Sequence, residues 1–300
     1  MKKSRPPKFS ILPTERVNPR SADLDRLSPA GVVARLDAEN RRVAAVVARA
    51  AARVAQAASL AAEAYRGGGK ILFAGAGTSG RLGVLEAAEC PPTFGVEPSK
   101  VQALMAGGKS AVFRSREGAE DDFRAGEREG ARKARPQDCV IGIAASGVTP
   151  YVAGVLHAAA KCGCSTVLVT CNPKPVNFRP DVLVSLDTGP EALAGSTRMK
   201  AGSATKMALN SITTAAMVLC GKVYGNRMVD LKPCSAKLEA RAVRLVAELG
   251  KVGQMRALAL LESAGWEAKT AIVMARRKTG AAQARGLLAE KGGFLRGVIG

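Results

Sequence analysis

The sequence predicts an α/β protein with a parallel sheet and a small helical module at its C-terminal end. Three observations predict this class. Short apolar runs alternate with helical patterns between residues 70 and 221, the first run leads into a glycine-rich loop, and only helical patterns follow residue 245. Strands that alternate with helices of this length form βαβ units, whose parallel sheet is covered on both faces.

Three regions follow one another along the chain. Residues 1–20 are rich in proline and charge and predict a loosely held arm, residues 21–240 predict the α/β domain, and residues 241–300 predict a three-helix module. Apolar residues at helical spacing between 21 and 64 indicate long amphipathic helices before the first strand. The predicted strands are Lys70–Ala74, Val101–Ala106, Cys139–Ala144, Thr166–Cys171 and Val182–Leu186. The predicted helices are Gly80–Cys90, Glu117–Lys133, Pro150–Lys161, Arg198–Gly221, Ala257–Ser263, Glu267–Arg276 and Ala281–Glu290.

Composition and charge argue against several classes. No apolar run approaches the roughly 18 residues of a membrane span, and the basic N-terminus leads into no apolar stretch, so we expect a cytoplasmic protein with no membrane role. The net charge is +20, but the basic residues are dispersed over helical segments without interleaved aromatics, which disfavours nucleic acid as the partner. Seven scattered cysteines predict reduced thiols. Cys162 and Cys164 form a close pair with His157 nearby, too few ligands to predict a metal site.

The loop Gly75–Gly80, after the first predicted strand, is the strongest sign of a ligand site. A strand that enters a glycine- and hydroxyl-rich loop at a helix N-terminus presents backbone N–H groups and the positive dipole end to an anion. Glu89 follows about two and a half turns later, where it could face the same ligand, and Pro91–Pro92 is expected to end the helix. A phosphate seat with a carboxylate beside it indicates acid–base chemistry on a phosphorylated small molecule.

Gly75, Gly77 and Gly80 also fit the dinucleotide fingerprint GxGxxG. A dinucleotide site has an acidic residue about 20 residues further on to hold the ribose, and residues 101–108 contain none. This mismatch disfavours a nicotinamide cofactor.

Two more hydroxyl-rich loops, residues 145–150 and 195–200, follow the third and fifth predicted strands. Hydroxyl groups beside free backbone N–H groups suit a phosphate or a sugar hydroxyl, although serine and threonine also cap helices for structural reasons. Three such loops at the carboxyl edge of one sheet favour a ligand site there.

These motifs identify a family resemblance that covers the chain from about Leu12 onward. The chain resembles the N-acetylmuramic acid 6-phosphate etherases of the sugar isomerase (SIS) superfamily, and the block Glu89–Thr93 is the most specific match. Further matching segments are residues 14–25, 75–95, 117–121, 144–147, 195–202 and 221–226.

The resemblance implies an SIS-type fold and a homodimer with the site near the subunit interface. It also implies cleavage of the lactyl ether of a phosphorylated amino sugar by elimination and hydration, in cell-wall sugar recycling or catabolism, without a metal or redox cofactor. Glu89 would protonate the departing D-lactate, and Glu120 would remove the proton at C2. The implied substrate and phosphate ligands are Gly77, Thr78, Ser79, Ser146, Gly147, Thr149, Ser196, Arg198 and Lys200.

Reasoning from the residues alone leaves alternatives open. Glu89 is favoured only slightly over Glu86, which lies on an adjacent helical face. The choice of base is open among Glu117, Glu120, Asp121 and Asp122. Arg198 and Lys200 fit equally well as the start of a helix where they pair with Glu191.

Val148 departs from the family pattern, which usually has arginine there, and so removes a cation from the second loop. Two other functions compete with the etherase. One is a non-enzymatic sugar-phosphate regulator related to the glucokinase regulatory proteins, and the other is an aldose–ketose isomerase. The presence of both Glu89 and Glu120 favours the enzyme, because a regulator needs neither an acid nor a base.

Overall fold

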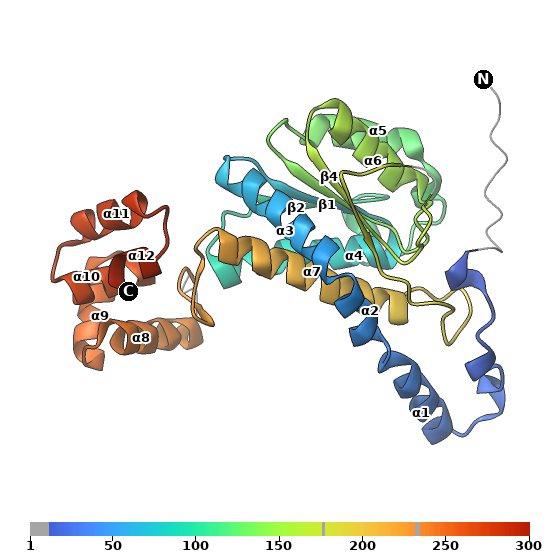
Figure 1. Ribbon diagram of the computed structural model, residues 1–300, viewed down its shortest axis with the longest axis horizontal. Coiled ribbons are helices and arrows are strands. Elements are labelled where there is room, and N and C mark those ends of the chain that lie inside the picture. Colours follow the sequence, from blue (N-terminus) through green and yellow to red (C-terminus); the bar gives the residue numbers. More distant parts are fainter. Residues whose placement is uncertain (1–11, 176–177, 232–234) are drawn as a thin grey trace. The chain divides into compact units, whose positions relative to one another are not determined.

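The computed structural model describes residues 12–175, 178–231 and 235–300, which separate into two compact units (Figure 1). The first unit is Met1–Ala87 with Val101–Thr213, and the second is Ala88–Lys100 with Thr214–Gly300. The second unit therefore begins near residue 214 and takes in an earlier segment, whereas we predicted a module that begins at residue 241.

The first unit is built on a five-stranded parallel sheet with the order β2-β1-β3-β4-β5. Each predicted strand is present to within one residue at either end. β1 and β3 are fully buried, as expected for apolar strands covered on both faces. The strands are β1 (Ile71–Gly75), β2 (Val101–Met105), β3 (Cys139–Ile143), β4 (Ser165–Thr170) and β5 (Val182–Ser185).

Helices cover both faces of this sheet (Figure 1). Leu72 of β1 faces α5 (Phe123–Lys133) and α6 (Pro150–Lys161), and joins a core cluster with residues of α6. The next residue, Phe73, faces the other side, where a Cβ atom at Gly83 of α4 (Gly77–Phe94) would lie 2.8 Å from the Phe73 Cβ.

Glycines set the spacing between α5 and α6. A Cβ atom at Gly126 would lie 2.0 Å from the carbonyl oxygen of Tyr151, and one at Gly154 would lie 2.1 Å from that of Phe123. These positions have no room for a larger side chain, so the two helices pack backbone to backbone.

The predicted helical region before the sheet forms α1 (Pro29–Asn40), α2 (Val43–Arg49) and α3 (Ala51–Arg66). Of the predicted arm, residues 1–11 lie outside the described part of the chain, and residues 12–20 are not loosely held. Asn18 is 2% exposed, and its Nδ2 donates to Glu39 Oε2 at 3.0 Å and to the carbonyl of Pro190 at 3.3 Å. These buried hydrogen bonds fix the segment to the sheet unit.

Helix α4 continues through Pro91 and Pro92 to Phe94, so the prediction that these prolines end the helix is wrong. Proline has a fixed φ near −65°, which is itself helical, and α4 continues here despite the lost N–H donors and the clash of each ring with the preceding turn. The helix ends instead at Gly95, which has φ +63° and donates its N–H to the carbonyl of Pro91 at 2.9 Å.

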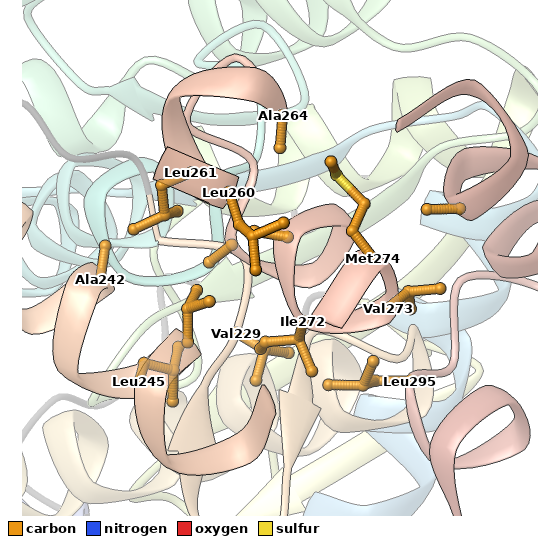
Figure 2. Packing of buried hydrophobic residues seen from close by; sticks show 14 of the residues in the cluster. Val229, Ala242, Leu245, Leu260, Leu261, Ala264, Ile272, Val273, Met274 and Leu295 are labelled. Atoms are coloured by element: carbon orange, nitrogen blue, oxygen red, sulfur yellow. The ribbon is translucent and has the colours of Figure 1, made fainter. Parts of the chain in front are cut away.

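The second unit is helical, with a two-strand hairpin of β6 (Val223–Tyr224) and β7 (Arg227–Met228). Figure 2 shows its core, in which Leu261 and Ile272 are fully buried. The unit also has a helix that was not predicted from the sequence, α8 (Ala236–Gly250), which Ser235 caps by accepting the N–H of Leu238. The other helices are α9 (Gln254–Ser263), α10 (Ala268–Arg277), α11 (Ala281–Glu290) and α12 (Arg296–Ile299). Helix α7 (Lys200–Leu219) runs from the first unit into this one.

Two expectations from composition can be compared with the described residues. The six cysteines among them are free thiols. Within the same ranges, no single helix has the length and apolar character to cross a membrane. The bent pair Pro29–Arg49 and Ala51–Arg66, at 62°, satisfies those two criteria only when taken together.

Candidate active site

The strand order creates a topological switch point between β1 and β3. From β1 the chain passes to the edge strand β2 and then returns to place β3 on the other side of β1. In open parallel sheets, ligands bind at the carboxyl ends of the strands beside such a point. The loops after β1 and β3 are two of the three predicted hydroxyl-rich loops, so the sheet brings them to the same place.

The first loop turns tightly from β1 into α4. Gly77 has φ +53°, and a Cβ atom at Gly80 would lie 2.6 Å from the carbonyl oxygen of Gly75, so both positions favour glycine. Thr78 and Ser79 follow in the first turn of α4, half-buried. The first N–H groups of a helix have no partner within the helix, so this turn offers donors and hydroxyl groups to an anion.

The second loop is fixed by hydrogen bonds to the end of β4. Gly147 has φ +70°, and the N–H of Val148 bonds to Ser146 Oγ at 3.3 Å. The carbonyl of Ser146 accepts from Asn172 Nδ2 at 2.9 Å, which ties the loop to the segment that follows β4. Thr149 precedes α6 and makes no side-chain capping bond to it. Backbone donors and hydroxyls from this loop thus stand beside those of the first.

The third loop ends at a helix terminus that a carboxylate already occupies. Glu191 is fully buried and accepts the N–H groups of Lys200 at 3.0 Å and Ala201 at 2.8 Å, at the start of α7. Burial raises the pKa of the Glu191 carboxyl. Lys200 therefore starts a helix and pairs with Glu191 through its backbone, which was one of the two predicted alternatives, and this terminus is closed to a phosphate.

The side chain of Lys200 is held by a second carboxylate, Glu39 of α1. Lys200 Nζ lies 2.5 Å from Glu39 Oε2, and both side chains are 3% exposed. Hydrogen bonds to the same carboxylate from Arg20, at 2.5 and 3.0 Å, and from Lys200 and Asn18 lower the pKa of Glu39 to about 2. Sequence reasoning missed Glu39, because no motif distinguishes it among 25 acidic residues.

The rest of the third loop is more accessible. Arg198 is exposed and Ser196 is half-buried. A Cβ atom at Gly202, in the first turn of α7, would lie 3.6 Å from Thr78 Cγ2, so the start of α7 lies against the first loop. All three predicted loops therefore meet at this end of the sheet.

Glu120 and the first loop share one cavity. Glu120 lies in the 3-10 turn Ala119–Asp121, and it lines a cavity of about 110 Å³ together with Gly77 and Arg81 of α4. Arg81 donates to the carbonyls of Val112 at 2.7 Å and Ala111 at 2.9 Å, which holds the segment before Glu120 against α4. Glu120 thus opens on the same space as Gly77 of the first loop, whereas Thr78 and Ser79 do not line it.

The geometry narrows the alternatives for the base. Asp122 accepts the N–H of Ala125 at 2.8 Å and so caps α5. Asp121 is not among the residues that line the cavity, whereas Glu117 lines it with Glu120. Of the four candidate carboxylates, Glu117 and Glu120 are therefore the two that line this cavity.

Glu86 and Glu89 of α4 have different environments. Glu86 is 3% exposed, and it accepts from Asn210 Nδ2 and Thr213 Oγ1, both at 2.7 Å, so it ties α4 to α7. Glu89 is exposed and belongs to the second unit. Of these two carboxylates, Glu89 is the one open to a ligand.

The switch-point loops and the parallel sheet define a sugar isomerase-type (SIS) domain. Residues 53–160 match the family model of the glucokinase regulatory protein N-terminal SIS domain. Among solved structures, that of a protein from E. coli CFT073 aligns with a TM-score of 0.47 at 17% identity, over 67% of this chain and 97% of that chain.

Relatives that align over nearly the whole chain define the family more narrowly than the SIS domain does. The N-acetylmuramic acid 6-phosphate etherases of Salmonella agona (strain SL483) and Salmonella choleraesuis (strain SC-B67) are each 49% identical to this chain over 293 residues, 97% of this chain and 99% of the relative. The chain belongs to the N-acetylmuramic acid 6-phosphate etherase family, as the motif resemblance predicted.

Proposed function

We propose that this protein cleaves the D-lactyl ether of N-acetylmuramic acid 6-phosphate, giving N-acetylglucosamine 6-phosphate and D-lactate. The observation that carries the proposal is the cavity that Glu120 shares with Gly77, because it places a carboxylate beside the first loop. The etherase relatives, 49% identical over nearly the whole chain, support this substrate.

In this proposal the phosphate binds at the N-termini of α4 and α6. Thr78 and Ser79 supply hydroxyl and N–H donors from the first loop. Ser146, Gly147 and Thr149 supply them from the second. The terminus of α7 takes no part because Glu191 fills it, and Ser196 and Arg198 on the preceding loop remain available to the sugar.

Val148 lies between these donors and is 4% exposed, so its side chain packs inward and the second loop presents no cation at this position. The charge of the phosphate is then matched mainly by oriented N–H groups and hydroxyls. We expect an active enzyme whose phosphate affinity depends on both loops together.

The proposed reaction is an elimination followed by a hydration. Glu120 takes the C2 proton, which is acidic because C2 lies next to the C1 aldehyde of the open-chain sugar, and the C3–O bond breaks as the C2–C3 double bond forms. Glu89 protonates the departing oxygen, because a lactate alkoxide leaves poorly. Water then adds its oxygen at C3 and C2 regains a proton, so the sum is one substrate and one water converted to two products.

Helix geometry suggests how Glu89 reaches the substrate. Ser79 and Glu89 are ten residues apart on α4, and ten helical residues measure about 15 Å. The phosphate and the C2–C3 bond of one sugar lie closer together than that. We therefore propose that the protein is a homodimer in which Glu89 serves a site whose phosphate is held by the second copy.

D-lactate release from N-acetylmuramic acid 6-phosphate tests the function. We expect release by the wild type and loss of release in Glu89→Ala and Glu120→Ala. Glu117→Ala is the matched control because Glu117 lines the same cavity and should remain active. Sugar-phosphate binding without release of lactate would favour a regulator, and conversion to a ketose without lactate would favour an isomerase.

Mixing the two inactive variants tests the shared site. If Glu89 and Glu120 of one site come from different copies, half of randomly mixed dimers carry one intact site, and activity recovers to about a quarter of wild type. No recovery after subunit exchange would refute the shared site and leave the lactate assay of the wild type unaffected.

A further inference from the structure

The second unit contains a cavity of about 580 Å³ whose lining includes none of the residues assigned to the reaction. It is lined from α10 and α11, from the segments before β6 and after β7, from the turn before α10, and by Gly95 and Gly293. The lining side chains include Lys222, Asp230, Trp266, Glu267, Lys269 and Arg285. This volume accommodates a small metabolite.

The lining carries more cations than anions. Lys222 Nζ and Lys269 Nζ lie 3.0 and 2.9 Å from the same oxygen of Asp230, so two ammonium groups share one carboxylate. Arg285 pairs with Glu267 at 2.8 Å. Among the described lining residues, three cations thus face two carboxylates.

Lys269 is the most buried of these cations. It is 8% exposed, and it also donates to the carbonyl of Gly293 at 2.8 Å. Burial lowers its pKa, although Asp230 acts in the opposite direction. An anion in the cavity would offset the cost of burying this ammonium group.

Helix α10 opens on the same cavity. Ala268, Lys269 and Thr270 form its first turn and line the cavity, and no acceptor for their N–H groups is found within the described ranges. The N-cap residue Glu267 does not cap them, because its carboxylate accepts instead from the Thr270 hydroxyl at 2.7 Å and from Arg285. Figure 2 shows the following turn of α10 anchored in the core through Ile272 and Val273, which fixes this terminus in place.

Trp266 forms part of the wall and is the only tryptophan of the chain. Its backbone has φ +64°, an uncommon conformation for a large residue, and its side chain packs in part against the core of the unit. The indole therefore gives an apolar surface beside the cations, and its fluorescence reports on this cavity.

We propose that this cavity binds a small phosphate monoester, with the phosphate held by Lys222, Lys269 and the first turn of α10. A phosphate is favoured over a carboxylate because its three terminal oxygens can use two ammonium groups and several N–H groups at once. The site uses none of the residues assigned to the reaction.

Trp266 fluorescence provides the test. Inorganic phosphate and N-acetylglucosamine 6-phosphate are titrated separately into the full chain, with N-acetylglucosamine as the uncharged control and D-lactate as the carboxylate. We expect a saturable change with both phosphates. Tighter binding of the ester than of inorganic phosphate shows that the indole wall contributes. No change with either, or an equal response to D-lactate, overturns the proposal.

Variants identify which site produces the signal. Lys222→Ala should weaken binding by about tenfold, the value of one charge-assisted hydrogen bond, and should leave lactate release unchanged. Arg256→Ala removes the same charge from an exposed position on α9 and should bind as wild type. Lys269→Met should also weaken binding, with thermal unfolding measured to show that it folds. An unchanged signal in Lys222→Ala, or a signal lost in Ser146→Ala, refutes the site.

Discussion

Replacing Glu39 by glutamine tests the buried ion cluster that ties α1 to the start of α7. Glutamine keeps the shape of the side chain but removes the charge, so Lys200 and Arg20 lose their shared carboxylate while Lys200 stays 3% exposed. Removing one partner of a buried pair costs about 3–5 kcal/mol. The lowering of the Glu39 pKa from 4.5 to about 2 corresponds to a contribution of about 3 kcal/mol from the ionised carboxylate to the free energy of unfolding.

The same shift fixes the sign of the pH dependence. Because the pKa of Glu39 is lower in the folded state, the ionised carboxylate stabilises the fold above about pH 4.5, and this contribution is lost as the pH falls from about 4.5 to about 2. The Glu39→Gln variant should therefore be less stable at neutral pH and should depend less on pH across that acid range.

Urea unfolding of the wild type and Glu39→Gln, at neutral pH and through the acid range, measures both effects. The double variant Glu39→Gln with Lys200→Met removes the stranded ammonium group and should recover part of the loss. Equal stability of Glu39→Gln and wild type at neutral pH, or an unchanged acid dependence, would refute the reasoning.

Four further substitutions test the fold and the site. Gly126→Ala should lower the free energy of unfolding by at least about 2 kcal/mol, because its Cβ would meet a backbone carbonyl. Gly286→Ala, in α11 with no atom within 4 Å, should instead raise the free energy of unfolding by about 0.5–1 kcal/mol. Urea unfolding measures both changes. Asp138→Asn should cost about 1–3 kcal/mol in the same assay, because the buried carboxylate accepts two backbone N–H groups that an amide cannot both satisfy. Arg81→Lys should lower kcat for lactate release about tenfold with little change in melting temperature. The reason is that a lysine cannot donate to both carbonyls of the segment before Glu120. An unchanged kcat would contradict the role of Arg81 in positioning that segment.

The strands of the sheet were predictable because each one is indicated by residues that are adjacent in the sequence. Apolar runs such as those of β1 and β3 are typical of parallel strands buried on both faces, and each ended at a loop with its own glycine signal. Helix ends were less predictable. Pro91 and Pro92 were expected to end α4, but the conformation of Gly95 ends it instead. The boundary of the second unit was also missed, because that unit combines residues 88–100 with residues after 213.

The candidate site likewise has a part that the sequence predicted and a part that only the fold shows. The first and second loops were identified from residues adjacent in sequence, and their strands brought them together. Whether Lys200 of the third loop is paired depends on Glu39, which lies 161 residues away in the sequence. No local sequence pattern predicts that contact. Among the candidate bases, only the fold shows that Asp122 caps a helix while Glu120 lines a cavity.

The buried charges near the third loop also decide how this chain can attract a phosphate. Lys200 is committed to Glu39, Arg81 donates to two carbonyls, and Val148 presents no charge in the second loop. Neutralisation by the first and second loops therefore depends on helix N-termini and hydroxyls, which are fixed dipoles and need no counter-ion. The net charge of +20 then acts at longer range, by steering a dianionic substrate toward the protein, so salt should slow association more than it weakens the bound complex.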